Sequence, residues 1–410
     1  MSEIEIELTT SVYGGDAMGR TPDGRAVFVP FALPGERVRA RLVEEKRNFA
    51  RAELLEVLVP ARERILPRCP HFGTCGGCHY QQLDYPSQLH LKTRILRDQL
   101  VRIAGIADPP LGAIVPSPSP WNYRNTLQFH LDPQGRFGFQ AAGGRGVLAV
   151  RECHLPEPAL NAFWPGLELE PVPGLERISM RLGAGDEILL ALEGDEMEAP
   201  EVSIEELPVS VVYLGPGGSL VMAGDDAVVM VVLERPFRVS AGSFFQVNTP
   251  MAEAMVGHVL GLLDPQPNQV VLDLYCGAGL FSAFLAPLAG AVIGLELSPS
   301  ACADFAVNLD DFENVSLYEG AAEDILPHLD LRIDSAVVDP PRAGLERTAL
   351  DALLALRPRR LVYVSCDPAT LARDAKRLLV GGYQLSRITP FDLFPQTYHI
   401  ESIALFEPTS

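Results

Sequence analysis

The sequence predicts an α/β protein whose C-terminal part is a doubly wound, mostly parallel sheet. From about residue 240, buried-type strands alternate with helical stretches, which is typical of a parallel sheet covered by helices. Residues 1–60 instead show short alternating strands, and residues 109–236 are rich in strands and turns without long helical periodicity. At 410 residues the chain is too long for one compact core, so we expect two or three domains.

Composition and termini indicate an ordinary globular protein. Hydrophobic residues make up 47% and charged residues 21% of the chain, which is close to the average for folded domains. The longest apolar runs, such as residues 227–233, are far shorter than the ~20 residues of a membrane helix, so we expect no membrane partner. The acidic, alternating start at residues 1–7 lacks the blocks of a signal peptide. We therefore expect a cytoplasmic protein.

The net charge of −20 argues against a nucleic-acid partner, because phosphate binding needs local positive potential. The distribution of charge points the other way. Acidic residues crowd the stretch 168–206, whereas basic residues cluster near the N-terminus: Arg37, Arg39, Arg41, Lys46, Arg47 and Arg51. Nearly all positive charge is arginine, which forks onto phosphates and stacks on bases. A compositional bias of the genome would explain the same excess of arginine over lysine.

Residues 1–60 predict a small OB-like β-barrel with one basic face. In the segment 36–43, Val38, Ala40 and Leu42 alternate with three arginines, and successive side chains of a strand point to opposite faces. The arginines then share one face. Two interpretations stay equally open: a surface that binds RNA, and the solvated outer face of an ordinary barrel.

The seven cysteines favour a metal centre. An odd number without a secretory signal argues against a disulfide framework. Cys69, Cys75 and Cys78 lie in a loop rich in proline and glycine, and Cys153 is the nearest candidate for a fourth ligand. Four thiolates suit either a [4Fe–4S] cluster or structural zinc. Three histidines leave a zinc site with three cysteines open: His71, His79 and His154.

A helix is predicted over residues 86–105, because Pro86 suits the first helical position and Gly105 the position after the last. Its apolar stripe must dock on another part of the protein. Further on, the segment 121–125 groups aromatic, amide and guanidinium side chains. These suit contact with bases or phosphates, and a structural turn explains them equally well.

The parallel sheet begins with a buried strand at 270–274, which leads into a turn containing Gly277 and Gly279. A second strand, 291–295, ends in Glu296, where an acid can accept hydrogen bonds from ribose hydroxyls. This order predicts a cofactor that contains a nucleoside. Later strands are expected at 315–318, 335–338, 361–365, 384–388 and 400–406.

Cys366 follows the buried strand 361–365 directly, and Asp339 follows the strand before it. Ligands of open parallel sheets bind outside the carboxyl ends of the strands, so chemistry is expected at these two residues. The alternative is a buried free cysteine that packs as a small apolar side chain. The polar neighbours Ser365 and Asp367 make that alternative weaker.

The stretch Asp273-x-x-x-Gly277-x-Gly279 resembles motif I of S-adenosylmethionine-dependent methyltransferases, with Ser282 in place of a third glycine. Over almost its whole length the chain resembles the RNA uracil-5 methyltransferase family. The motifs that carry this resemblance are the four cysteines, Phe244-Phe245-Gln246-Val247-Asn248, Asp339-Pro340-Pro341-Arg342, Ser365-Cys366-Asp367-Pro368 and the segment Phe394 to Glu401.

The resemblance implies three domains. Residues 1–60 would be a TRAM barrel that binds RNA, and residues 61–240 a β-rich central domain with an iron–sulfur loop. Residues 241–410 would be a seven-stranded, Rossmann-like S-adenosylmethionine methyltransferase domain, on which the helix 86–105 docks. Leu280 departs from the family, because some members carry a cofactor-contacting Asn at this position.

The resemblance also implies the site residues. Cys366 would be the nucleophile and Glu401 the base. The cofactor S-adenosylmethionine would be contacted by Gln246, Tyr275, Gly277, Glu296 and Asp339. A [4Fe–4S] cluster would be held by Cys69, Cys75, Cys78 and Cys153.

The expected function is methylation of carbon 5 of a specific uridine in structured RNA, with 23S ribosomal RNA favoured and a monomeric enzyme expected. An adduct between Cys366 and carbon 6 would be resolved by Glu401. Transfer RNA is the alternative substrate. The alternative of another class is a non-catalytic RNA-binding or RNA-folding iron–sulfur protein, against which the presence of Cys366 and Glu401 argues.

Overall fold

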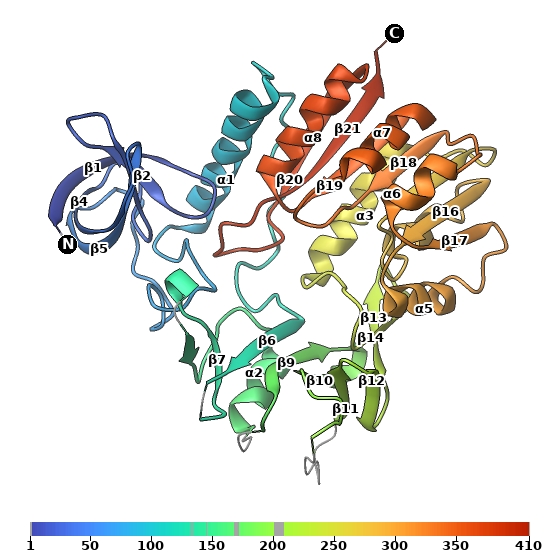
Figure 1. Ribbon diagram of the computed structural model, residues 1–410, viewed down its shortest axis with the longest axis horizontal. Coiled ribbons are helices and arrows are strands. Elements are labelled where there is room, and N and C mark those ends of the chain that lie inside the picture. The colour runs from blue at the N-terminus through green and yellow to red at the C-terminus, as the bar shows by residue number, and fades with distance from the viewer. Residues whose placement is uncertain (1, 133, 145, 168–171, 201–208, 410) are drawn as a thin grey trace.

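The computed structural model describes residues 2–132, 134–144, 146–167, 172–200 and 209–409. Figure 1 shows an N-terminal barrel, a central sheet and a C-terminal α/β part arranged around the middle of the molecule. None of the helices in these ranges combines the length and the apolar character needed to cross a lipid bilayer.

The N-terminal strands close into a barrel in the order β1-β2-β3-β5-β4. Their bounds are Glu3–Ser11 (β1), Ala17–Arg20 (β2), Ala26–Val29 (β3), Arg37–Glu45 (β4) and Phe49–Val59 (β5). Val38, Ala40 and Leu42 fill the inside of the barrel together with apolar residues of the other strands. The alternation predicted for β4 is therefore correct.

The outer face of the barrel is not the bare basic surface that the sequence suggests. Arg39 forms ion pairs with Glu56 at 2.8 Å and with Glu5 at 3.3 Å. Arg41 lies 3.3 Å from a carboxylate oxygen of Glu53. These acids come from β1 and β5, the two strands that flank β4. The sequence pattern of β4 alone could not reveal them.

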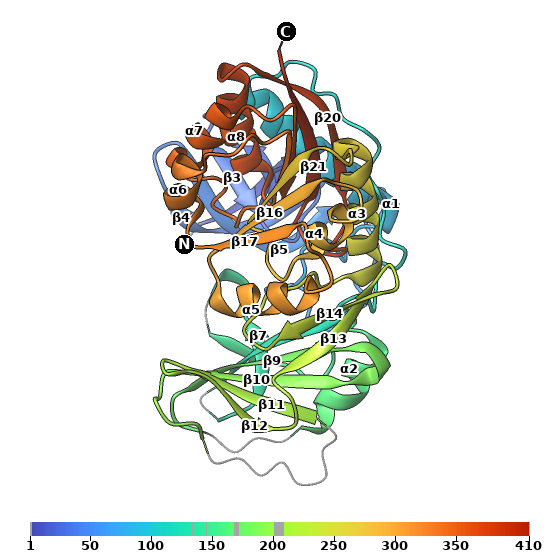
Figure 2. The ribbon, with the colours of Figure 1, turned by 90° about the vertical axis from the view of Figure 1, so that its right-hand side faces the viewer.

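The central part is a seven-stranded sheet in the order β12-β11-β10-β9-β6-β7-β8. Its bounds are Thr126–Leu131 (β6), Phe137–Gln140 (β7), Val147–Ala149 (β8), Leu175–Leu182 (β9), Ile188–Gly194 (β10), Val209–Gly215 (β11) and Gly218–Ala223 (β12). The short helix α2 (Pro158–Phe163) packs against it through Leu160, next to Trp164. In Figure 2 this sheet lies below the α/β part.

A separate hairpin, β13 (Ala227–Val232) and β14 (Arg235–Ser240), joins the central sheet to the α/β part. Its residues Val228, Met230 and Phe237 are buried in the same core as the first helix of the α/β part, α3 (Thr249–Leu263). The hairpin therefore packs with the α/β part, although it precedes residue 241.

Helix α1 (Tyr85–Gln99) begins at Asp84, whose carboxylate accepts the backbone N–H of Ser87 at 2.8 Å. The helix continues as a π-helical turn, Leu100–Ala104, and ends at Gly105 with φ 77°. Both pieces contact α8 (Pro368–Val380). The apolar stripe of α1 is thus buried in the core of the α/β part.

The α/β part contains a seven-stranded sheet in the order β17-β16-β15-β18-β19-β21-β20, in which only β21 runs against its neighbours. The strands are Val270–Leu274 (β15), Ala291–Glu296 (β16), Val315–Glu319 (β17), Ser335–Val338 (β18), Arg360–Ser365 (β19), Tyr383–Phe391 (β20) and Glu401–Pro408 (β21). This confirms the predicted seven-stranded fold.

Helices cover both faces of this sheet. Alternate residues of each strand enter two cores, with Val271 and Val362 in one and Leu272 and Tyr363 in the other. The remaining α-helices of the described residues are Leu280–Leu285 (α4), Pro299–Asn308 (α5), Ala322–Ile325 (α6) and Arg347–Leu356 (α7), and a 3-10 turn, Leu326–His328, follows α6. Such double coverage leaves the carboxyl ends of the strands free for a site.

Candidate active site

A cavity of about 640 Å³ opens at the carboxyl ends of the parallel strands. All the residues predicted to bind the cofactor or to act in catalysis line it: Gln246, Tyr275, Gly277, Glu296, Asp339, Cys366 and Glu401. The topology explains why the last two meet. Because β21 is antiparallel to β19, with Ser402 opposite Ser365, its first residue lies where β19 ends.

The turn after β15 brings the backbone close to the cavity. Tyr275 and Gly277 adopt positive φ values of 64° and 56°. Gly279 has φ 91°, and a Cβ atom there would lie 2.3 Å from Cδ1 of Leu309. Only glycine satisfies both constraints at this position.

Glu296 ends β16 and is held by three backbone donors. Gly277 donates its N–H to Oε2 at 2.9 Å, and Leu297 and Ser298 donate theirs to Oε1 at 2.9 and 2.8 Å. The carboxylate is therefore fixed: Oε1 accepts two hydrogen bonds, and Oε2 accepts one and keeps a further lone pair. That lone pair can accept a hydrogen bond from a ribose hydroxyl.

Asp273, near the end of β15, contacts the residues that follow the glycine turn and does not line the cavity. Its Oδ2 accepts a hydrogen bond from Ser282 Oγ at 2.6 Å, and burial raises its pKa to about 7. Ser282, which stands in place of the third glycine of motif I, thus has a structural role of its own. Leu280 is buried in the apolar core and is also absent from the cavity wall.

Cys366 lies between β19 and α8 in strongly acidic surroundings. Burial raises the pKa of its thiol to about 12, helped by the charges of Glu401 and Asp339, while Arg342 opposes the shift. The thiol is therefore protonated in the free protein at neutral pH. For Cys366 to react as a thiolate, its pKa must fall when the ligands of the cavity bind.

Glu401 and Asp339 form an acidic pair beside the thiol. Burial and then the charge of Asp339 raise the pKa of Glu401 well above its usual range. Burial, and to a smaller extent Asp273, raises the pKa of Asp339 to about 7. Carboxyl groups with raised pKa values can exchange protons near neutral pH.

Three other residues of the cavity wall were named from the sequence without a primary role: Arg342 and Phe244 within family motifs, and His399 as an alternative base. Arg342 could have been found from its place two residues after Asp339-Pro340. Phe244 is 68% exposed, which no sequence signal shows. Burial and nearby cations, Arg342 first among them, lower the pKa of His399 to about 3, so its imidazole is neutral.

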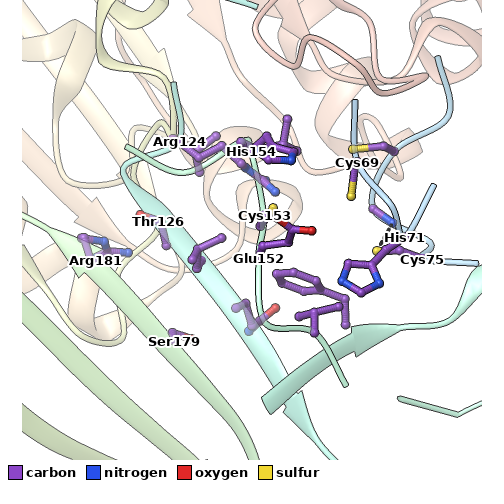
Figure 3. A pocket seen from close by; sticks show the side chains of 18 of the residues that line it. Cys69, His71, Cys75, Arg124, Thr126, Glu152, Cys153, His154, Ser179 and Arg181 are labelled. Carbon is purple, nitrogen blue, oxygen red and sulfur yellow. Dashed lines mark hydrogen bonds between the residues drawn. The ribbon is translucent and has the colours of Figure 1, made fainter. Parts of the chain in front are cut away.

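The four cysteines predicted to bind metal line a second cavity of about 510 Å³ (Figure 3). It shares Gly242 and Phe244 with the first cavity. Burial raises the pKa of Cys78 to about 12 and that of Cys153 to about 11, and neighbouring thiols add to both shifts. In the part of the chain that the structure describes, no three His, Cys, Asp or Glu residues are grouped as ligands of a metal ion.

The three histidines considered as zinc ligands separate in space. His71 and His154 line the cysteine cavity. His79 instead packs its ring edge-on against Tyr398 at 4.6 Å. Two residues of the predicted contact segment 121–125 lie at or near this cavity. Arg124 lines it. Trp121 packs edge-on against His154 at 6.2 Å, and the guanidinium of Arg68 lies over its ring at 5.3 Å.

Two family models match the chain. The model described as tRNA (Uracil-5-)-methyltransferase matches residues 225–408, and the TRAM domain model matches residues 2–55. A protein of Aquifex aeolicus named "Uncharacterized RNA methyltransferase" is 37% identical and is aligned over 99% of both chains. A protein of Streptomyces coelicolor with the same designation is 34% identical over 100% of this chain and 93% of its own.

Among solved structures, the fold is similar to that of the Pyrococcus abyssi tRNA (uracil-54, C5)-methyltransferase in complex with S-adenosyl-L-homocysteine. The TM-score is 0.74 and the sequence identity 22%, over 99% of this chain and 100% of the other. At this identity the likeness establishes the shared fold, including the order of barrel, central part and α/β part.

Proposed function

This chain belongs to the tRNA (uracil-5-)-methyltransferase family, and from this premise we propose that it methylates carbon 5 of a uridine through a covalent adduct with Cys366. It is an RNA methyltransferase that uses S-adenosylmethionine. The observation that carries the proposal is that Cys366, Glu401 and the fixed carboxylate of Glu296 all line the same cavity.

The chemistry explains why a thiol is needed. Carbon 5 of uracil is a weak nucleophile, and addition of a thiolate to carbon 6 moves electron density onto carbon 5 as an enolate. S-adenosylmethionine supplies the electrophilic methyl group. Cys366 suits the addition because a thiolate is strongly nucleophilic, and Arg342 is the charge on the cavity wall that favours its thiolate form.

Glu401 would complete the cycle by removing the proton from carbon 5, so that the bond between sulfur and carbon 6 breaks. A carboxylate whose pKa is raised by burial is a stronger base than an exposed one. Gln246, Tyr275, Gly277, Glu296 and Asp339 would hold the cofactor on the same wall. The target base must leave its stack to reach this cavity.

For the substrate we favour 23S ribosomal RNA. The ground is the resemblance to the family, in which a TRAM barrel together with an iron–sulfur loop favours this RNA, and the chain has both the barrel and the cysteine loop. Transfer RNA is the second candidate, and the description of the matching family model favours it. Mapping 5-methyluridine in both RNAs after deletion of the gene distinguishes them. Loss from ribosomal RNA alone is the expected result, and loss from transfer RNA alone would overturn it.

Two substitutions test the mechanism by the species that accumulate. Cys366→Ala removes the nucleophile, so neither adduct nor methylated RNA should form. Glu401→Gln allows addition and methyl transfer but slows proton removal, and loss of a general base typically costs ~10²–10⁴-fold. A protein–RNA band that survives denaturing electrophoresis and carries label from the cofactor should therefore build up in Glu401→Gln.

The double variant Cys366→Ala, Glu401→Gln is the control, and its adduct band should vanish. Turnover of Glu401→Gln at the wild-type rate would show that another residue is the base, with His399 the nearest alternative. Wild-type protein that binds RNA without transferring labelled methyl groups would favour the non-catalytic RNA-binding alternative.

We also propose that Cys69, Cys75, Cys78 and Cys153 hold a [4Fe–4S] cluster. The residues fit this group, because four half-buried thiols line one cavity, and a cluster places its own iron and sulfide between its ligands. One zinc ion would need all four sulfurs at ~2.3 Å from itself, a tighter grouping than the described residues show. The cluster would join the loop at Cys69 to the segment at Cys153.

Anaerobic purification tests the cluster. The protein should be brown and contain about four iron and four sulfide per chain, and Cys153→Ser should lose most of both. Replacement of Cys302, a buried cysteine outside this cavity, should change neither. Stoichiometric zinc without iron or sulfide would contradict the proposal.

We further propose that the protein is cytoplasmic and monomeric. Light scattering of the purified protein tests the oligomeric state.

A further inference from the structure

The segment that joins β20 to β21, residues 392–400, contains a residue in an unusual backbone conformation. Gln396 has φ 70°, in the left-handed region that residues other than glycine rarely adopt. It is also buried, with 2% of its surface exposed. Such a conformation persists only where the surrounding structure holds it, and it is found most often at functional sites. The conformation of Gln396 therefore points to a role of its own.

Gln88 of α1 holds Gln396 from one side. Oε1 of Gln88 accepts the backbone N–H of Gln396 at 3.1 Å, and Nε2 of Gln88 donates to Oε1 of Gln396 at 3.0 Å. Gln88 thus binds the backbone and the side chain of Gln396 together. The two residues are 308 positions apart in the chain, so α1 fixes a turn that belongs to the α/β part.

The cysteine loop and the segment before β6 hold the other polar groups of Gln396. Its carbonyl oxygen accepts the backbone N–H groups of His79 and Tyr80 at 2.8 and 3.0 Å. Its Nε2 donates to the carbonyl oxygen of Pro120 at 3.3 Å. All four polar groups of Gln396, two on the backbone and two on the side chain, therefore have partners outside the segment 392–400.

The neighbours of Gln396 carry this restraint to the cavity at the carboxyl ends of the strands. Oγ1 of Thr397 donates to the carbonyl oxygen of Phe394 at 2.9 Å and accepts the backbone N–H of His399 at 3.2 Å. Phe394, His399 and Glu401 line the cavity. Gln396 does not line it, so it can affect the site only through the residues on either side of it.

We propose that Gln396 is a positioning residue, which holds the segment between β20 and β21 on the side of the cavity that receives the target base. The inference rests on the proposed function, in which Cys366 and Glu401 act on a uridine. Glu296 ends β16 and the glycine turn follows β15, and β18 and β19 lie between β15 and β21 in the sheet. Release of Gln396 should therefore impair the steps on the base and spare cofactor binding.

Gln88→Leu is the direct test, because it removes two hydrogen bonds of Gln396 and leaves the sequence of the segment intact. The matched control is Gln82→Leu. Gln82 is fully buried too, and its side chain has no hydrogen-bond partner among the described residues. Three quantities are measured: the kcat of RNA methylation, the Kd of S-adenosylhomocysteine by calorimetry, and the hydrogen exchange of a peptide that spans residues 394–400.

We expect Gln88→Leu to lower kcat by roughly tenfold, since two buried hydrogen bonds are lost. Exchange in the peptide 394–400 should become several-fold faster, because the N–H of Gln396 loses its acceptor and the segment opens more often. The Kd of S-adenosylhomocysteine should stay at the wild-type level. Gln82→Leu should change none of the three quantities.

Gln396→Gly tests the other partner of this contact. Glycine adopts the left-handed conformation freely, so the turn can keep its path while the side-chain hydrogen bonds to Gln88 and Pro120 are lost. The kcat should fall as in Gln88→Leu. The double variant should be no slower than the slower single variant, because both substitutions act through the same contact. Asp264→Gly is the control: Asp264 has φ 45°, is exposed and follows α3 outside the cavity.

Wild-type kcat in both Gln88→Leu and Gln396→Gly would overturn the inference. A parallel loss of cofactor affinity and kcat would overturn it too, because the substitutions would then have acted on the fold as a whole. Failure of the wild-type protein to form 5-methyluridine would instead count against the proposed function. Hydrogen exchange needs no RNA, and in that case an unchanged rate in Gln88→Leu would still overturn the role of Gln396.

Discussion

Among single residues, Cys366 shows most clearly how its surroundings oppose its proposed task. A thiol whose pKa is raised to about 12 has very little thiolate at neutral pH. Arg342, from the motif after β18, is the positive charge on the cavity wall that acts against this shift. The reactivity of the thiol should therefore depend on an arginine that is distant from it in the sequence.

Arg342→Met should raise the pKa of Cys366 further and slow its alkylation by iodoacetamide at every pH between 7 and 10. The effect should be a few-fold, because Arg342 is exposed and water screens its charge. In the wild type the rate should rise about tenfold per pH unit across this range, since the range lies below the pKa.

Arg347→Met is the control, because Arg347 is exposed and pairs with Asp351 on α7, outside the cavity wall. Its alkylation profile should match the wild type. A wild-type rate that levels off below pH 8 would mean that the thiol is already activated in the free protein.

Among the elements, α1 and the segment after β20 depend on each other. Lys92 on α1 and Asp392 are both fully buried, and their charged atoms lie 2.6 Å apart. Lys92 also donates to the carbonyl oxygen of Phe394 at 2.9 Å, and Gln88 binds both backbone and side chain of Gln396. The helix thus shapes the segment that carries Phe394 and His399 into the cavity.

Lys92→Met should lower the free energy of unfolding by roughly 3–5 kcal/mol, because it leaves the Asp392 carboxylate buried without its partner. Urea unfolding measures this loss. Arg102→Met, at the exposed pair with Asp98 in the following π-helical turn, should cost less than ~1 kcal/mol. The double variant Lys92→Met, Asp392→Leu should recover much of the loss, and no recovery would show that the hydrogen bonds to Phe394 dominate.

At the scale of the whole molecule, a cluster of arginines in the sequence is not the same as available positive charge in the structure. Arg39 and Arg41 of β4 are matched by glutamates of neighbouring strands. Arg124, which lines the cysteine cavity, has no ion pair with any residue that the structure describes. Phosphates should therefore meet available positive charge near the two cavities.

The salt dependence of RNA binding measures this difference. Each phosphate that loses its contact lowers the slope of log K against log salt concentration by ~0.7–0.9. Arg124→Gln should lower the slope by about one such step, whereas Arg39→Gln with Arg41→Gln should leave it nearly unchanged. A double variant in β4 that lowers the slope by two steps would show that phosphates displace the glutamates.

Much of the fold and of the site could be predicted from the sequence, because those features are local. The alternation in β4, the glycine turn after β15 and the seven strands of the α/β part each arise from patterns within a few residues. Glu296, Asp339 and Cys366 could also be placed at the main cavity, since residues at the carboxyl ends of parallel strands share one edge. Gln246, Tyr275 and Glu401 were expected there from the family resemblance.

What the sequence determined by itself is therefore the order of the elements, the seven-stranded sheet and the residues at its carboxyl edge. The tertiary structure decided which charges are neutralised and what surrounds the thiol. Arg39 and Glu56, Lys92 and Asp392, and Tyr13 and Tyr398 come together only when separate strands, helices and domains pack. Their separation along the chain leaves no local pattern, because Coulombic and hydrogen-bond energies depend on distance in space and on burial.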